Sequence, residues 1–217
     1  VVKHHPRYTV LSAVFGAGMV GGVSVGLSTF STLAELEHLI AVSDLSVLLF
    51  DARVLQKDFG AMLLELEASL LTASAGEARL ARAPRLRHLV RLDAVASEVG
   101  GETGAAMADA AVFEPWAAFL QRGAAVPVAQ VESCAQAVDE HDVGGLFFSS
   151  GTTSLPKGIL HSQRAFALQW WRYPRLMKVD GAVRSWTGNG FFWSGNIAMT
   201  VGLALSSGGA VILQPLF

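Results

Sequence analysis

The sequence contains a single cysteine, Cys134, in 217 residues. One cysteine cannot form an intrachain disulfide, and Cys134 has no neighbours with metal-ligand spacing, so we predict a small apolar side chain in a reducing compartment. The histidines are scattered too, among them His4, His5, His141 and His161, and we expect no metal site built from protein side chains. No secretory signal is visible, although the first residue is valine. These absences favour a cytoplasmic protein.

The net charge is also small: 16 lysines and arginines against 18 aspartates and glutamates leave a net charge of −2. A chain so close to neutral gives no electrostatic reason to expect a nucleic-acid partner. The one basic run falls in a predicted helix-to-strand connection, where we expect it to be solvated. It consists of Arg79, Arg82, Arg85, Arg87, His88 and Arg91.

Two long stretches, Tyr8–Ala34 and Ser185–Phe217, have no charged side chain at all. Each exceeds the roughly twenty residues that cross a bilayer, and Gly18-x-x-x-Gly22 has the spacing of helix pairing in lipid. Glycine pairs and polar residues interrupt both stretches, however, and buried strands of a parallel sheet are also continuously apolar. We expect buried sheet without an integral membrane span, and a membrane protein stays as an alternative.

What the sequence does have is a segment of small, hydroxylated and flexible residues that ends in one lysine. It reads Ser149-Ser150-Gly151-Thr152-Thr153-Ser154-Leu155-Pro156-Lys157-Gly158. Glycine lets backbone N–H groups approach a phosphate, the hydroxyls add donors, and lysine adds a mobile positive charge. Gly144–Phe148 before it and Ile159–His161 after it read as strands, and Ser162 as the start of a helix. We predict an anion-binding connection between two strands.

The Walker phosphate loop does not fit this segment, because Pro156 precedes Lys157 and Gly158 follows it. The segment resembles the phosphate loop of the adenylate-forming superfamily, which includes acyl-CoA synthetases, luciferases and the adenylation domains of peptide synthetases. That motif usually reads Ser/Thr-Ser-Gly-Thr-Thr-Gly-x-Pro-Lys-Gly, so this chain departs only at Ser154. The family resemblance implies an α/β fold of mostly parallel sheet layers with flanking helices.

The flanking sequence is similar to the family's helix–strand alternation. Thr32-x-x-Glu35 is a capping box for a helix through Ile40. Residues 77–136 are predicted to hold a strand near Leu89, a surface helix starting at Glu114-Pro115-Trp116, and a linker. The other expected elements are helix Val10–Gly18, strand Gly22–Leu27, strand Ser46–Asp51, helix Phe59–Leu71, and, within Gly202–Leu213, a helix end, a Gly208-Gly209 turn and a strand.

A competing pattern lies in Gly16-Ala17-Gly18-Met19-Val20-Gly21, which satisfies the dinucleotide-binding fingerprint, with Glu37 at a suitable distance. That fingerprint requires a strand before the glycines and a helix after them. Val23, Val25 and Gly26 favour a strand after them instead, so we interpret these glycines as turn and close-packing positions.

The resemblance implies activation of a carboxylic acid by ATP to an acyl-adenylate, followed by transfer to coenzyme A. ATP, Mg²⁺ and coenzyme A are the implied cofactor and co-substrates. The phosphates would contact Ser149, Ser150, Gly151, Thr152, Thr153, Ser154, Lys157 and Gly158. The segment around Phe191, Phe192, Trp193 and Gly195 is similar to the motif beside the acyl and pantetheine pocket, with Trp193 where many members have histidine; an aromatic core cluster is the alternative. These aromatics favour a fatty or aryl acid.

The resemblance covers residues 1–217 as part of the family's large N-terminal domain. The adenine, ribose and C-terminal lysine motifs are not found, so the chain is expected to lack the C-terminal domain and to be inactive alone, with no catalytic residue assigned. A stand-alone nucleotide-binding module is the other alternative. The sequence does not specify the acid, the thiol acceptor or the oligomeric state.

Overall fold

The computed structural model describes residues 6–92, 110–149 and 155–213. Contacts divide the chain into two compact units. Unit 1 comprises Val1–Val10 and Ser31–Pro127, and unit 2 comprises Leu11–Phe30 and Val128–Phe217. Within the described ranges, no helix is long and apolar enough to cross a membrane.

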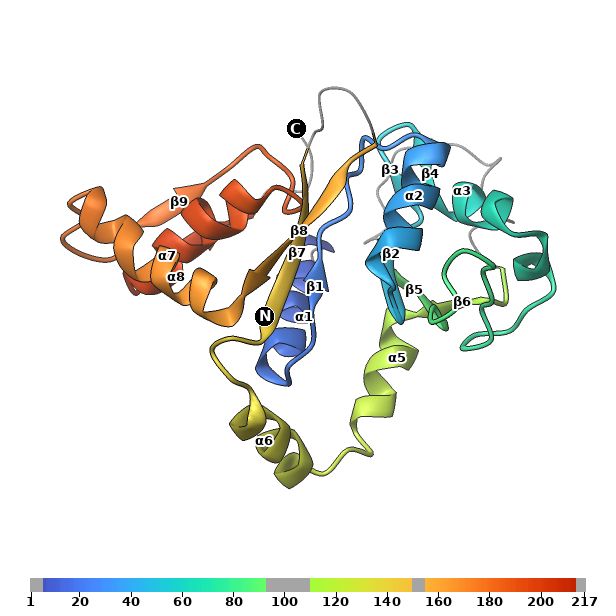
Figure 1. Ribbon diagram of the computed structural model, residues 1–217, viewed down its shortest axis with the longest axis horizontal. Helices are drawn as coiled ribbons and strands as arrows, with labels where there is room; N and C mark the ends of the chain where they lie inside the picture. The colour runs from blue at the N-terminus through green and yellow to red at the C-terminus, as the bar shows by residue number, and fades with distance from the viewer. Residues whose placement is uncertain (1–5, 93–109, 150–154, 214–217) are drawn as a thin grey trace. The chain divides into compact units, whose positions relative to one another are not determined.

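Unit 1 is built around a parallel three-stranded sheet in the order β2-β5-β6 (Figure 1). Its strands are β2 (Val47–Asp51), β5 (His88–Leu92) and β6 (Phe113–Pro115), and its helices are α2 (Leu33–Ser43), α3 (Phe59–Leu66), the 3₁₀ helix η1 (Ala68–Leu71) and α5 (Trp116–Gly123). A small antiparallel pair, β3 (Arg53–Val54) and β4 (Lys57–Asp58), leads into α3. The core is mostly aliphatic, with Leu39, Leu63, Leu89 and Val90 almost fully buried.

The predicted capping box starts α2. Thr32 Oγ1 accepts from the Glu35 backbone N–H at 3.3 Å, and the Glu35 carboxylate accepts from the Thr32 N–H at 2.8 Å. These hydrogen bonds from Thr32 hold the pKa of Glu35 below its usual value. The helix continues past the predicted Ile40 to Ser43 and stops at Asp44, whose φ of +50° is left-handed.

The predicted helix Phe59–Leu71 is wrong in its second half. α3 ends at Leu66, because Glu67 is extended with φ −152° and ψ 114°, and η1 follows in a new direction. The Glu67 carboxylate accepts a hydrogen bond from the Ala81 N–H, and the change of direction lets Leu70 become fully buried. Burial of Leu70 therefore overrides a continuous helical pattern.

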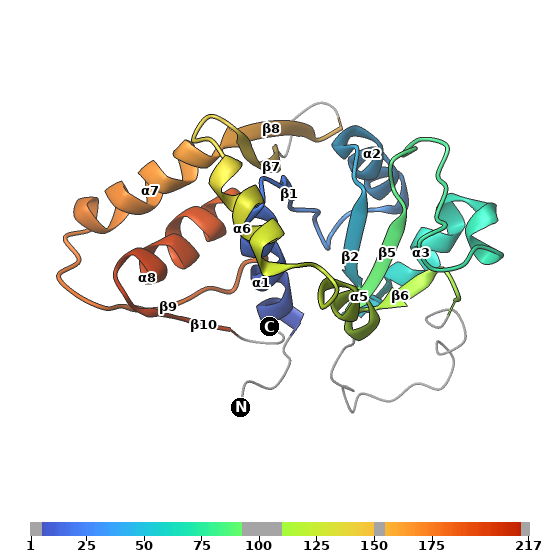
Figure 2. The same ribbon diagram turned by 90° about the horizontal axis from the view of Figure 1, so that it is seen from below.

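Unit 2 contains the sheet β1-β7-β8, in which β1 and β7 are parallel and β7 and β8 antiparallel. Its core consists of Leu11, Phe147, Ile197 and Val201, against which Phe166 and other aromatics pack. Figures 1 and 2 both show α7 and α8 side by side. The elements are α1 (Pro6–Met19, which begins in unit 1), β1 (Ser24–Val25), α6 (Val128–Ala137), β7 (Val143–Ser149), β8 (Lys157–Ser162), α7 (Gln163–Leu176), β9 (Arg184–Trp186), the π-helix η2 (Asn196–Val201), α8 (Gly202–Ser206) and β10 (Ala210–Ile212), which pairs in parallel with β9.

The dinucleotide-binding alternative is excluded by the order of elements. α1 runs through Gly16 and Gly18 to Met19, and strand β1 follows, so the helix comes before the strand. Gly21 has φ +80° in the turn between them, where Gly22 N–H donates to the Ala17 carbonyl at 2.7 Å. The prediction of a turn position is confirmed for Gly21 and is wrong for Gly16 and Gly18, which lie within α1 with no described atom closer than 4.0 Å to an added Cβ.

Residues 128–137 form helix α6, so the predicted linker before β7 is wrong there. None of the helix's residues is buried, which explains why its sequence lacks an apolar period. Cys134 lies on this helix and is exposed. The prediction that Cys134 packs as a small apolar side chain is therefore also wrong.

Candidate phosphate and acyl site

The predicted phosphate segment connects two neighbouring antiparallel strands, β7 and β8, as the sequence indicated. Ser149 at the end of β7 lies opposite Lys157 at the start of β8, and the Ser149 hydroxyl donates to the Lys157 carbonyl at 3.4 Å. Both ends of the segment are therefore held together at one end of the hairpin. Ser150, Gly151, Thr152, Thr153 and Ser154 lie outside the described residues, and their role stays a prediction.

Two glycines in β7 let helix α7 lie directly on this hairpin. A Cβ added at Gly144 would come within 2.8 Å of the Gln163 side chain, and one at Gly145 within 2.9 Å of the Phe166 ring. Ser162 caps α7 by accepting from the Ala165 N–H at 3.2 Å, as predicted. The helix therefore braces the strand that leads into the phosphate segment.

His161 has a structural environment in β8. Its ring lies edge-on to Phe147 at 5.6 Å between centroids and 6.0 Å from Phe166. Such aromatic contacts favour packing over a role in chemistry.

Lys157 and Gly158 are exposed at the start of β8. Within the ranges that the structure describes, no carboxylate forms an ion pair with Lys157. A Cβ added at Gly158 would lie 3.3 Å from the methyl groups of Leu146, so glycine there keeps the two strands closely packed. The ammonium group is thus a positive charge available to an anion at the end of the hairpin.

The predicted aromatic residues lie between β9 and η2 and have different surroundings. Phe191 packs against the core of unit 2. Phe192 lies against the backbone of Gly26, where an added Cβ would come within 2.8 Å of the Phe192 Cα, and edge-on to Phe30 at 5.9 Å. Trp193 is 44% exposed, with its ring 5.3 Å from that of Phe192. Packing therefore accounts for the two phenylalanines, and Trp193 faces outward.

Asn196, which the sequence analysis missed, holds this aromatic segment in place. The side chain is 5% exposed, and its Nδ2 donates to the carbonyls of Asn189 at 2.6 Å and Gly190 at 3.1 Å. Its Oδ1 accepts from the Thr200 hydroxyl at 3.2 Å. Asn196 begins the π-helix η2, a conformation often found at functional sites. An asparagine in an otherwise apolar run was the signal for it.

Gly195 adopts ordinary helical angles, φ −58° and ψ −34°, so its backbone does not require glycine. A Cβ added there would meet no described atom within 4 Å. Because glycine in a helix costs roughly 0.5–1 kcal/mol relative to alanine, local structure gives no reason for its presence. Close approach of a ligand would supply one.

A model of the AMP-binding enzyme family matches residues 2–217. The chain belongs to this family. The fold is similar to that of the N-terminal domain of FACL13 from Mycobacterium tuberculosis, with 16% identity, a TM-score of 0.60, and coverage of 94% of this chain and 40% of that one. The search of curated proteins found no match.

Two other solved structures show the same likeness to this AMP-binding chain. One is the anthranilate CoA ligase AuaEII in complex with anthranoyl-AMP, with 17% identity, a TM-score of 0.59, and coverage of 94% of this chain and 33% of that one. The other is acetoacetyl-CoA synthetase from Streptomyces lividans, with 18% identity, a TM-score of 0.57, and coverage of 94% of this chain and 27% of that one. The predicted α/β fold of mostly parallel sheets with flanking helices is confirmed. The chain spans less than half of the length of these structures.

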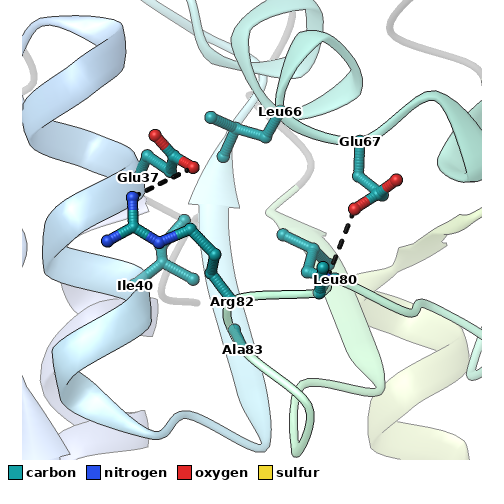
Figure 3. A pocket seen from close by; sticks show the side chains of 8 residues that line it. Glu37, Ile40, Leu66, Glu67, Leu80, Arg82 and Ala83 are labelled. Atoms are coloured by element: carbon teal, nitrogen blue, oxygen red, sulfur yellow. Dashed lines mark hydrogen bonds and ion pairs between the residues drawn. The ribbon is translucent and has the colours of Figure 1, made fainter.

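Among the described residues of this AMP-binding chain, no group of three or more His, Cys, Asp or Glu side chains could hold a metal ion. A cavity of about 120 Å³ does lie in unit 1, between α2 and the segment before β5 (Figure 3). Arg82 neutralises Glu37 at its wall, with 3.3 Å between Nη1 and Oε1, and the predicted site residues do not line it.

The prediction that the basic run is a solvated connection is confirmed for Arg79, Arg82 and Arg85, which are exposed. Arg82 and Arg85 form ion pairs with Glu37 and Asp44 that are well exposed on both sides. The prediction is wrong for His88 and Arg91, which are partly buried in strand β5; His88 Nδ1 lies 3.3 Å from the buried carboxylate of Glu114.

Glu114 belongs to strand β6, so it does not open the helix; α5 starts at Trp116, as predicted. Its two carboxylate oxygens accept from Arg122 Nη1 at 3.2 and 3.0 Å. The Arg122 guanidinium also lies over the Phe119 ring at 5.4 Å from the centroid. Together with His88, this buried carboxylate ties α5 to strands β5 and β6.

Proposed function

We propose that this chain is part of an ATP-dependent acid–thiol ligase, which activates a carboxylic acid as an acyl-adenylate and transfers the acyl group to coenzyme A. Family membership supports adenylation in general. The observation that carries the proposal is the β7–β8 hairpin, which brings Ser149 and the exposed Lys157 together around a segment of hydroxylated residues and glycine.

In the proposed reaction, a carboxylate oxygen attacks the α-phosphorus of ATP and forms a new O–P bond. The bond from the α-phosphorus to the bridging oxygen breaks, and pyrophosphate leaves with both of its electrons. A thiolate then attacks the acyl carbonyl, and AMP leaves. Both reactants of the first step are anions, so the protein has to reduce their repulsion and hold them in line.

Lys157 and the hydroxyl-rich segment are proposed to hold the β- and γ-phosphates. A lysine ammonium is a mobile point charge, which suits phosphates that move apart during the reaction. The Ser149 hydroxyl lies beside the Lys157 backbone and can turn its proton toward a phosphate oxygen. Gly158 keeps the strands closely paired below them.

We propose that Trp193 and Gly195 border the path of the acyl group and the pantetheine arm. Trp193 is exposed beside Phe192, and Gly195 leaves open space where a side chain would stand. An apolar aromatic border suits a fatty or aryl acid better than acetate. Phe191 and Phe192 support this border from the core side.

Mg²⁺ would enter with the triphosphate. The described residues provide no cluster of carboxylates or histidines for it, so the fitting ligands are phosphate oxygens and hydroxyls of the loop. Bound there, the ion would reduce the negative charge of the phosphates. A cytoplasmic location is part of the proposal, supported by the single, exposed cysteine.

We also propose that residues 1–217 correspond to part of the large N-terminal domain of such a ligase. The chain covers 40% of the FACL13 N-terminal domain and 27% of the acetoacetyl-CoA synthetase chain. We therefore expect the 217-residue chain to bind MgATP without catalysing carboxylate-dependent pyrophosphate exchange.

Calorimetric titration of the chain with MgATP, pyrophosphate and AMP tests the phosphate site. Lys157→Ala is expected to weaken binding of MgATP and pyrophosphate by about 10- to 100-fold, the value of one charged hydrogen bond, and to leave AMP binding unchanged. Lys178→Ala, which removes another exposed lysine of unit 2, is the matched control.

A wild-type chain that does not bind MgATP, or a Lys157→Ala variant that binds it equally well, would overturn the phosphate-site proposal. Pyrophosphate exchange by the same preparation would contradict the expected inactivity and leave the phosphate site intact. Binding without exchange is the expected result.

A further inference from the structure

One face of helix α7 combines basic and apolar side chains in solvent. Arg164, Leu168, Trp171 and Arg175 follow one another at spacings of four, three and four residues, which places them on the same side of the helix. Phe166 and Trp170 lie on another side, packed against the core of unit 2. The helix is therefore anchored in unit 2 through Phe166 and Trp170, and the outer face does not take part in that packing.

Several large apolar side chains on or beside this outer face are exposed to solvent. Trp171 is 56% exposed and Leu168 40%, and just beyond the helix end Leu176 and Met177 are 76% and 55% exposed. Large exposed apolar groups gathered in one place mark a surface that contacts something other than water.

All charged side chains that the helix and its end contribute to this surface are positive. Residues 163–178 contain Arg164, Arg172, Arg175 and Lys178 and no aspartate or glutamate, in a chain whose net charge is −2. Arg164 is paired with Glu140 at 2.8 Å. Within the described part of the chain, no carboxylate forms an ion pair with the other three, which are all exposed.

Arg175 and Trp171 are already arranged together. The guanidinium lies over the indole ring at 4.1 Å from the centroid, and its Nη1 donates to the Trp171 carbonyl. This stack holds a positive charge directly against a large apolar ring on the surface of the helix. Amphipathic aromatic and arginine side chains are typical of the boundary between lipid head groups and acyl chains.

From these observations we propose that the outer face of α7 binds the surface of an anionic lipid bilayer. Arg172, Arg175 and Lys178 would contact the negative head groups, and Trp171, Leu176 and Met177 would enter the boundary region. The partner is identified by charge complementarity, since a neutral apolar surface would leave three unpaired positive charges without a counterpart. The helix would lie on the membrane, in keeping with the lack of a spanning helix in the described ranges. This binding does not depend on the proposed nucleotide site.

Sedimentation with phosphatidylcholine vesicles, with and without phosphatidylglycerol, tests the proposal on the whole chain. We expect binding to the vesicles that contain phosphatidylglycerol, weakening as salt is added. Near an anionic surface each basic residue strengthens binding about fivefold, so the triple variant Arg172→Gln, Arg175→Gln, Lys178→Gln is expected to bind about 100-fold more weakly.

The control triple variant Arg53→Gln, Arg79→Gln, Arg85→Gln removes three exposed positive charges from unit 1 and is expected to bind as the wild type does. Trp171→Ala is expected to weaken binding, and Trp186→Ala, which removes a tryptophan that is 51% exposed on β9, to have little effect. Circular dichroism checks that each variant is folded.

Three results would overturn the proposal: no binding by the wild type, equal binding to neutral vesicles, or equal losses in the two triple variants. The second would indicate apolar adhesion, and the third a dependence on total charge alone. Loss in the α7 triple variant with retention in the unit 1 triple variant supports the proposed surface.

Discussion

Asp51 makes the stability of unit 1 depend on pH. It lies at the carboxyl end of β2, where its Oδ1 is buried without a hydrogen-bond partner among the described residues. Burial raises the pKa of Asp51 from 3.8 to about 6, because the charged carboxylate loses its hydration. The folded state therefore holds the proton to a higher pH than the unfolded state does.

The sign of the effect follows from proton linkage. Below pH 3.8 the carboxyl group is protonated in both states and costs nothing. Between pH 3.8 and about 6 the unfolded state ionises while the folded state keeps the proton, so stability is lost, and above about pH 6 the loss is complete. The raised pKa corresponds to about 3 kcal/mol at neutral pH, and solvent screening of a group that is only partly buried reduces the expected loss to about 2 kcal/mol.

Urea unfolding of the wild type and of Asp51→Asn at pH 4 and pH 8 measures this effect. We expect the variant to be about 2 kcal/mol more stable at pH 8, with most of that difference gone at pH 4. Asp180→Asn, at an exposed position in unit 2, is the control and should change neither value by more than about 0.5 kcal/mol. The reasoning is refuted if Asp51→Asn shows the same pH dependence as the wild type, or is less stable at pH 8.

Two further substitutions test the packing that supports the site. Gly145→Ala should destabilise the chain by about 1–3 kcal/mol, because the new methyl group would meet the Phe166 ring at 2.9 Å, whereas Gly16→Ala, with no atom within 4 Å, should stabilise it by about 0.5–1 kcal/mol; thermal unfolding compares the two, and equal effects would contradict the packing argument. Asn196→Ala should cost about 1–3 kcal/mol, because the carbonyls of Asn189 and Gly190 lose their donor. Asn189→Ala, at an exposed side chain, should cost less than about 0.5 kcal/mol, and a similar loss in both variants would argue against the hydrogen-bonding role of Asn196.

Local signals in the sequence predict much of the fold. The capping box at Thr32 and the cap at Ser162 are confirmed because each depends on a few neighbouring atoms. The strand predicted over Ser46–Asp51 is confirmed as Val47–Asp51, and the turn at Gly208 is confirmed as well. Gly208 has φ +70°, and a Cβ at Gly209 would lie 1.9 Å from the Val183 carbonyl oxygen.

Errors occur where distant contacts or solvent exposure decide the structure. The break after Leu66 depends on the burial of Leu70 and on a hydrogen bond from Ala81, neither of which local periodicity reports. α6 lies wholly on the surface, so it has no apolar period to identify it. The pairing of Glu114 with Arg122 and His88 likewise depends on strands that are adjacent only in the folded chain.

The sequence predicted the residue types of the phosphate segment and its position between two strands. The structure shows at which of these positions side-chain packing accounts for the residue. Gly145 leaves room for the Phe166 ring, and Gly144 and Gly158 lie against the side chains of Gln163 and Leu146. Packing would therefore favour glycine at these positions even in a protein that binds no phosphate.

Packing leaves two residues of the proposed site unexplained. Lys157 is exposed without an ion pair in the described part of the chain, and Gly195 has helical angles and open space around its missing side chain. An unpaired charge next to a hydroxyl-rich segment contributes little to folding, and a helical glycine in open space reduces stability. Both become understandable if an anion meets the lysine and a narrow ligand passes the glycine. The case for a ligand site therefore rests more on these two residues than on the glycines that make the motif conspicuous.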